Sequence, residues 1–162
     1  MKIKKLTLLA LCVSLAMILS FIESQIPAFV AIPGVKMGFT NIVVVYVLYK
    51  LGWKEAIVIS LIRVFLVGIL FGNGVSLIYS FAGALVSFIG MLLLKKSKAF
   101  SCMAVSVTGG VLHNLAQIGA ASLVMTTNIL TYYAPFLILS GTIAGTAIGI
   151  IAAILIKRID VK

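Results

Sequence analysis

The fold class of this chain follows from one uncharged stretch, residues 99–156: AFSCMAVSVTGGVLHNLAQIGAASLVMTTNILTYYAPFLILSGTIAGTAIGIIAAILI. Between Lys98 and Lys157 there is no lysine, arginine, aspartate or glutamate. The stretch is far too long for one buried helix, and it is long enough for two membrane-spanning helices with a loop between them. It also contains the only histidine of the chain, in the string HNLAQ at residues 113–117. Because polar groups are costly to place in lipid, this string marks a candidate site.

The composition of the whole chain is that of an integral membrane protein. The mean hydropathy is +1.30, 63% of the residues are hydrophobic and only 10% are charged, whereas about 25% charged residues are typical of soluble domains. A length of 162 residues suits a single domain, residues 1–162, without an appended ATPase or catalytic domain. We predict an all-α membrane protein, a compact bundle of six transmembrane helices at residues 6–22, 37–50, 55–72, 75–94, 101–125 and 134–156.

The second of these segments is unusually short. Its uncharged run extends from Met37 to Tyr49, which as a helix reaches roughly 20 Å, whereas a hydrocarbon core is about 30 Å thick. Either neighbouring residues complete this span, or it is a half-embedded helix beside a site.

The net charge of +10 indicates a membrane topology rather than nucleic-acid binding. If six spans run up and down, all of the 13 lysine and arginine residues except Lys36 and Arg63 fall on one side of the membrane. This positive-inside pattern predicts that both termini are cytoplasmic. The first segment has a basic start, but the residues around Ser20 offer no small-x-small cleavage site. An uncleaved span is therefore favoured over a signal peptide.

The sequence predicts no catalytic centre, cofactor or metal site. Cys12 and Cys102 lack metal-ligand spacing, and there is a single histidine. Three acidic residues in all leave no Asp-rich pair to hold magnesium and a diphosphate, so no enzymatic activity is expected. No Gly-x-x-x-x-Gly-Lys-Ser/Thr string occurs either, so ATP-driven transport would need a motor in another subunit.

Arg63 stands near the middle of the third segment, between apolar runs. A charged side chain at that depth costs at least about 2.5–3.5 kcal/mol on insertion scales, so it is expected to face a polar interior or a partner. Its guanidinium suits a carboxylate or phosphate through bidentate hydrogen bonds. We predict a role in ligand binding or in organising the site, and the structural alternative is pairing with Glu23 or with helix-end carbonyls.

His113, Asn114 and Gln117 give the fifth segment a polar face. His113 and Gln117 are four residues apart and share one side of a helix, with Asn114 a little around it. Their donors and acceptors suit a polar ligand inside the membrane, and the alternative is hydrogen bonding between helices.

A second centre is predicted where Pro33 and Gly34 break the chain before the second segment. A broken backbone that leads into a helix N-terminus offers free N–H groups and a favourable dipole for anions, although an ordinary loop would have the same sequence. Lys36 and Asn41 are therefore predicted to lie near the mouth of a cavity. Tyr79 and Ser80, in the fourth segment, have hydroxyls that are predicted to line the same cavity, with packing as their alternative role.

Two rows of small residues have a four-residue spacing that permits close approach of helices. The row in the first segment is Cys12, Ala16 and Ser20. The row in the sixth segment is Gly141, Gly145 and Gly149. The glycine row is predicted to pack inside the bundle. The first row serves either internal packing or docking to a partner membrane protein.

A set of motifs along nearly the whole chain resembles a known family. These are Glu23-Ser24-x-Ile26-Pro27, Pro33-Gly34-Val35-Lys36-x-Gly38-x-x-Asn41, Lys54-Glu55-Ala56, Arg63, Phe71-Gly72, Tyr79-Ser80-x-x-Gly83, Ser87, Met91, Phe100-Ser101, Ser106-Val107-x-Gly109 and His113-Asn114-x-x-Gln117. In these motifs the chain is similar to the Gx transporter family, also labelled heptaprenyl diphosphate synthase component I. That family is in turn similar to the S components of energy-coupling-factor transporters, which are small six-helix membrane proteins.

The resemblance implies a mechanism of uptake across the cytoplasmic membrane of a bacterium. An S component captures a vitamin or related micronutrient from outside, joins a membrane coupling subunit and two cytoplasmic ATPases, and topples to release the ligand inside. In S components, small residues of the first span often mediate docking, commonly as Ala-x-x-x-Ala. The row at positions 12, 16 and 20 is a looser version of that motif.

We therefore predict an S-component-like protein that binds a small ligand in an outward-facing cavity. Arg63, His113, Asn114 and Gln117 are expected to make the polar contacts. The alternative is a non-catalytic membrane subunit that assists prenyl diphosphate or quinone metabolism, for example by recruiting a soluble synthase. A third possibility is a facilitator that works alone.

Overall fold

The computed structural model describes residues 2–25, 38–72, 74–126 and 132–159, and these residues form helices and short connections without a strand. The helices are α1 (Lys2–Gln25), α2 (Asn41–Lys50), α3 (Trp53–Phe71), α4 (Gly74–Ser97), α5 (Cys102–Met125) and α6 (Ala134–Arg158). They correspond one to one to the six predicted segments. The all-α prediction is confirmed for the described part of the chain.

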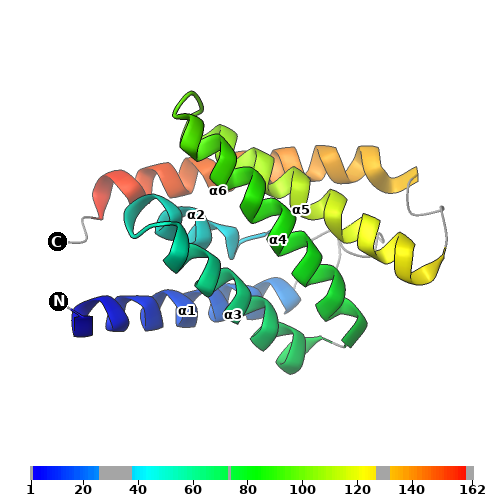
Figure 1. Cartoon of the computed structure of the whole chain (residues 1–162), viewed down its shortest axis with the longest axis horizontal. Helices are drawn as coiled ribbons and strands as arrows, with labels where there is room; N and C mark the ends of the chain where they lie inside the picture. The colour runs from blue at the N-terminus through cyan, green and yellow to red at the C-terminus, as the bar shows by residue number, and fades with distance from the viewer. Residues whose placement is uncertain (1, 26–37, 73, 127–131, 160–162) are drawn as a thin grey trace.

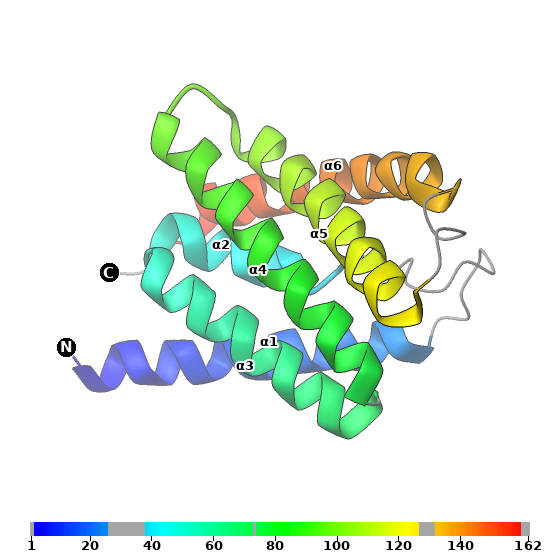
Figure 2. The same cartoon turned by 45° about the vertical axis from the view of Figure 1, so that its right-hand side comes forward.

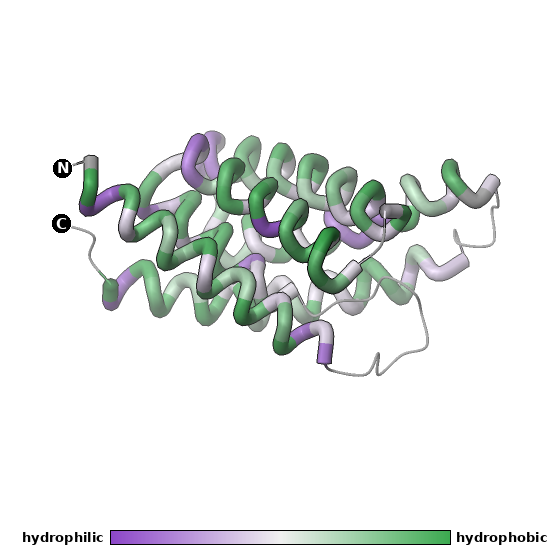
Figure 3. The backbone as a smooth tube through the Cα atoms, turned by 90° about the horizontal axis from the view of Figure 1, so that it is seen from below, coloured by the Kyte–Doolittle hydropathy of each residue, from purple (hydrophilic) through white to green (hydrophobic). Residues whose placement is uncertain are grey.

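Three helices of the described chain, α1, α4 and α6, are long and apolar enough to cross a membrane. The helices are hydrophobic over most of their length, and hydrophilic segments lie mainly near their ends (Figure 3). α3 and α5 are also long, with 19 and 24 residues, so it is their composition that sets them apart from these three. α3 carries three charged residues, and α5 carries the polar string at 113–117. The chain is a helical membrane protein.

Five helices pack in the order α1, α3, α4, α5, α6, each against the next, and the backbone of the short α2 approaches those of α1, α3, α5 and α6. Figures 1 and 2 show α2 behind α3 and α4, with α1 and α6 along opposite sides of the bundle. α2 therefore holds together the first and last helices of the row.

α2 is the centre of the hydrophobic core. Residues 43–48 are all buried, and they pack with Ala16 of α1, Ile59 of α3 and Phe88 of α4. At about 1.5 Å per residue its ten residues span only about 15 Å, roughly half of a hydrocarbon core. The segment predicted at 37–50 is thus a half-length helix from Asn41 onward, and polar side chains meet beyond its N-terminus.

Both termini lie at the same end of the bundle as the α2–α3 and α4–α5 connections (Figures 1 and 2). Apart from Arg63, the lysine and arginine residues of the described chain belong to this end. Lys5 of α1 forms an ion pair with Glu55 of α3. Lys95 of α4 donates a hydrogen bond to the Leu48 carbonyl of α2, and its ammonium lies 5.0 Å from the ring centroid of Tyr49. These contacts join two helix pairs at the basic end, α1 with α3 and α2 with α4.

The glycine row of α6 packs on α5, as predicted. A Cβ atom at Gly145 would lie 2.6 Å from the Cα atom of Val107, so the two backbones are in direct contact. The row Cys12, Ala16 and Ser20 is also buried inside the bundle, with exposed fractions of 7%, 0% and 6%. This is the packing alternative that the sequence left open. Docking through the row stays a prediction, and it would require α1 to move.

Candidate ligand-binding site

Two neighbouring cavities lie beyond the N-terminus of α2 and share Glu23, Arg63 and His113 as lining residues. The smaller has a volume of about 50 Å³, and the larger about 410 Å³. Ligand pockets commonly have volumes of about 300–1,000 Å³. The larger cavity is therefore of ligand size, whereas the smaller has room for a few water molecules.

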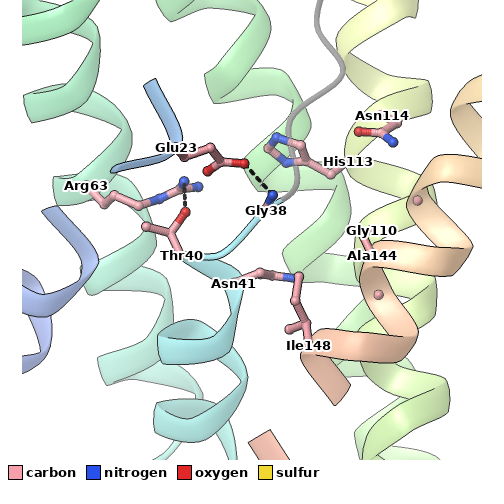
Figure 4. Close-up of a pocket in the computed structure, with 12 residues that line it drawn as sticks. Glu23, Gly38, Thr40, Asn41, Arg63, Gly110, His113, Asn114, Ala144 and Ile148 are labelled. Carbon is pink, nitrogen blue, oxygen red and sulfur yellow. Dashed lines mark hydrogen bonds between the residues drawn. The ribbon is translucent and has the colours of Figure 1, made fainter. Parts of the chain in front are cut away.

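The smaller cavity lies between the N-terminus of α2 and the α5–α6 interface (Figure 4). Its lining consists of Glu23, Gly38, Thr40, Asn41, Arg63, Gly110, His113, Asn114, Gly141, Ala144, Gly145 and Ile148. On the α5–α6 side the wall is mostly glycine and alanine, and its polar groups are His113 and Asn114 of α5.

The larger cavity lies between α1, α3, α4 and α5. Its lining consists of Ser20, Glu23, Ser24, Arg63, Val64, Val67, Gly68, Phe71, Gly72, Ser76, Ser80, His113 and Gln117. Polar side chains come from all four helices, and the large apolar ones come from α3 alone. The cavity therefore has both a polar and an apolar wall.

Arg63 is anchored at the start of α2. Its Nη1 donates a hydrogen bond to Oγ1 of Thr40 at 2.7 Å, and Thr40 is fully buried. The Nε atom of Arg63 is buried and has no hydrogen-bond partner among the described residues. Part of the guanidinium therefore has a structural role, and part of it has unused donor capacity.

The backbone at the start of α2 differs from the prediction. The N–H groups of residues 41–43 donate to the carbonyls of residues 38–40, at 2.8–3.1 Å. The N–H of Gly38 donates to the carboxylate of Glu23, the one acidic residue of α1. The expectation of free N–H groups for an external anion is wrong for these residues, because the carbonyls of residues 38–40 and the carboxylate of Glu23 already accept from them.

The polar residues of α5 divide between two neighbours. The amide of Asn114 donates to the Leu137 carbonyl at 3.0 Å and to the Ser140 hydroxyl at 3.3 Å, both in α6. Gln117 is 7% exposed, and its Oε1 is buried without a hydrogen-bond partner in the described structure. Asn114 therefore ties α5 to α6, whereas His113 and Gln117 lie on the side of the larger cavity.

Gly83 of α4 makes room for these two side chains. A Cβ atom at this position would lie 2.8 Å from Cγ of Gln117 and 3.0 Å from Cε1 and Nδ1 of His113. Such separations are too short for carbon atoms in contact. The close approach of α4 therefore fixes where His113 and Gln117 sit in the cavity wall.

The sequence model of the heptaprenyl diphosphate synthase component I family matches residues 12–155. The chain belongs to this family. The matched range contains every residue that lines the two cavities. No curated protein and no solved structure matches the chain.

In this component I protein most of the predicted site residues come together. Arg63, His113, Asn114 and Asn41 line the smaller cavity, and Gln117 lines the larger one together with Arg63 and His113. Tyr79 lines neither cavity, and its buried hydroxyl has no hydrogen-bond partner among the residues described. Lys36 lies outside the described residues.

Five polar cavity residues of the component I protein are not among the site residues that the sequence predicts: Ser20, Glu23, Ser24, Thr40 and Ser76. Glu23 was considered only as an ion-pair partner, although it is the one acidic residue on the less basic side of the chain. Ser80, whose hydroxyl the sequence does predict to line a cavity, lines the larger one, and Ser76 lies four residues before it on α4, a helical spacing that indicates a shared polar face. Ser20 was assigned to docking. The assembled side chains can hold a polar ligand by hydrogen bonds, and the described chain has no group of three or more metal-ligating residues.

Proposed function

We propose that this component I family protein is the substrate-binding membrane subunit of an uptake system. It binds a small, micronutrient-type ligand in an outward-facing cavity, and separate coupling and ATPase subunits supply the energy. The observation that carries the proposal is the cavity of about 410 Å³, which arranges Arg63, His113 and Gln117 around a ligand-sized volume.

The proposed topology has six crossings with both termini in the cytoplasm of a bacterium. It is supported by the basic residues at the end of the bundle where the termini lie (Figure 1). It is also supported by the interior position of the polar groups of α3 and α5, because a bundle interior tolerates polar groups that lipid does not.

Single cysteines at positions 72 and 100 test the topology in a variant whose native cysteines are serine. A membrane-impermeant thiol reagent is expected to label position 72 in intact cells and position 100 only after lysis. Labelling of both positions from one side would contradict six crossings.

Ligand binding is tested by native mass spectrometry of gently purified protein. We expect a retained small molecule in the wild type that is lost in Arg63→Ala. The matched control is Tyr79→Phe, which removes a buried hydroxyl outside both cavities and is expected to keep the molecule. Equal retention in Arg63→Ala and wild type would remove Arg63 from the site.

The energising partners are tested by affinity purification from the native host. Recovery of a membrane coupling subunit and ATPase subunits supports uptake. Recovery of neither, together with ATP-independent movement of solute in liposomes, would show a facilitator that works alone.

The family name favours a second candidate, a membrane subunit that assists prenyl diphosphate metabolism without catalysing it. Its test is the same purification. Recovery of a soluble prenyltransferase without ATPases would favour this candidate over uptake.

A further inference from the structure

Three polar atoms without hydrogen-bond partners belong to residues that line the larger cavity. They are Oγ of Ser20, Nε of Arg63 and Oε1 of Gln117, and each is buried within the described structure. The three residues come from α1, α3 and α5, so the fold rather than a single helix brings them to the wall of one cavity. A buried polar atom without a partner costs about 1–3 kcal/mol. A ligand that supplies the missing partners would therefore bind with a corresponding gain.

The three atoms differ in the partner that each requires. Nε of Arg63 is a donor only, and Oε1 of Gln117 is an acceptor only. The hydroxyl of Ser20 can do both. A ligand that satisfies all three must present an acceptor and a donor close together.

The charge of the lining limits the ligand further. Among the described residues that line the larger cavity there is one carboxylate, Glu23, and one guanidinium, Arg63. These charges offset each other. A diphosphate needs several cationic groups or bound metal ions around its oxygens. The carboxylate of Glu23 would also repel it, so the lining favours a ligand without net charge.

The apolar wall supplies the rest of the recognition. Val64, Val67 and Phe71 follow one another along α3, on the same side of the cavity as Arg63. An apolar body lying against them would place its polar end beside Arg63 and Gln117.

We infer that the ligand is a net-neutral small molecule with an amide-type edge on an apolar, ring-containing body. Its carbonyl accepts from Nε of Arg63, and its N–H donates to Oε1 of Gln117. This inference rests on the proposed binding function and adds the chemical class of the ligand.

The test uses four probes that share a phenyl ring and differ in the polar group: benzamide, benzoate, benzylamine and phenyl phosphate. The full chain in lipid nanodiscs is heated with each probe at equal millimolar concentration, and the shift of the unfolding midpoint is measured. A ligand that binds only the folded state raises this midpoint in proportion to its affinity. Benzamide is expected to give the largest rise. A larger rise with benzoate, benzylamine or phenyl phosphate, or no rise with any of them, would overturn the inference.

Two substitutions test the assigned contacts. Arg63→Lys keeps the positive charge and removes the Nε–H donor, and Gln117→Leu removes the acceptor at similar size. Each is expected to weaken benzamide binding by about tenfold or more, the factor that one well-formed hydrogen bond provides. Ser106→Ala is the matched control, because Oγ of Ser106 is also buried without a partner on α5 but lies at neither cavity.

Folding of each variant is checked by its circular dichroism spectrum and by its midpoint without probe. If Arg63→Lys or Gln117→Leu does not fold, Ser20→Ala replaces it, because Oγ of Ser20 is the third unpartnered atom of the lining and completes its hydrogen bonding with the same polar edge of the ligand. Its expected effect is a loss of about threefold or more. Folded variants that bind benzamide within twofold of the wild type would refute the assigned contacts. Preferential binding of phenyl phosphate would overturn the ligand class and leave a binding function in place. The proposed binding function is itself refuted if the purified protein retains no small molecule and no ATPase subunit copurifies with it.

Discussion

The substitution Gly83→Ala tests whether the close approach of α4 and α5 shapes the cavity wall. The added methyl group would lie 2.8 Å from Cγ of Gln117 and 3.0 Å from two ring atoms of His113. Cγ is close to the backbone of its residue, so Gln117 can escape only by a change of rotamer or by movement of α5. We expect both side chains to be displaced and the ligand to be lost.

The magnitude follows from a comparison with Gly119→Ala on α5. A methyl group at Gly119 would meet no atom within 4 Å. Alanine gains up to about 1 kcal/mol over glycine in a helix at either position. Overpacking at Gly83 costs about 1–3 kcal/mol in addition. The propensity gain cancels in the difference, so Gly83→Ala should be about 1–3 kcal/mol less stable than Gly119→Ala.

The assay is reversible unfolding by sodium dodecyl sulfate in mixed micelles, followed by circular dichroism. The retained small molecule is measured by native mass spectrometry on the same preparations. Gly119→Ala should match the wild type in occupancy and equal or exceed it in stability. If Gly83→Ala matched Gly119→Ala in both measurements, His113 and Gln117 would not pack against this glycine, and the described wall would be wrong.

Three further substitutions test contacts between helices in the same unfolding assay. Gly145→Ala would push a methyl group to 2.6 Å from backbone atoms of α5, which cannot rotate away. A loss near 3 kcal/mol is expected, and a loss below about 1 kcal/mol would contradict the close packing of α5 and α6. Asn114→Ala removes two hydrogen bonds to α6, each of which contributes about 0.6 kcal/mol in measured membrane proteins. A loss of about 1 kcal/mol is expected, and wild-type stability would show that the bonds are not formed. Lys95→Met removes a hydrogen bond to α2 and a cation–π contact. We expect the free energy of unfolding to fall by about 1 kcal/mol. An unchanged unfolding midpoint would contradict these contacts.

The helices could be predicted from the sequence because basic residues separate the apolar runs. The lysine residues near Lys50 and Lys95 mark where runs of apolar residues end, and α2 and α4 end close to them in the structure. The start of α2 was harder to place. Residues 37–40 are compatible with an apolar helix, but Gly38 has a φ of +72°, which glycine adopts easily and other residues rarely do. A periodicity argument does not detect one left-handed residue.

The sequence predicts which residues of α5 belong to the site, but it does not predict which neighbouring helix or cavity each of them faces. Helical spacing places His113 and Gln117 on one face and Asn114 about 100° away. The structure turns that face toward the larger cavity and Asn114 toward α6. Which neighbour each face meets depends on the order of the helices around the bundle, and no local pattern encodes it. For the same reason Tyr79, on α4, was assigned to a cavity that it does not line.

The short length of α2 explains why a charged residue is tolerated in α3. A helix that filled the whole interior would bury Arg63 against apolar side chains, at a cost of several kcal/mol. α2 instead has only ten residues. Just before its first turn Thr40 accepts a hydrogen bond from Arg63, and Glu23 lines the same two cavities as Arg63. The short length of α2 therefore accounts both for the cavity and for the charged residue in α3. Since Glu23 already supplies the negative charge that Arg63 requires, the remaining donor capacity of the guanidinium is suited to a neutral acceptor, and a ligand with a phosphate group would have to compete with the chain's own carboxylate.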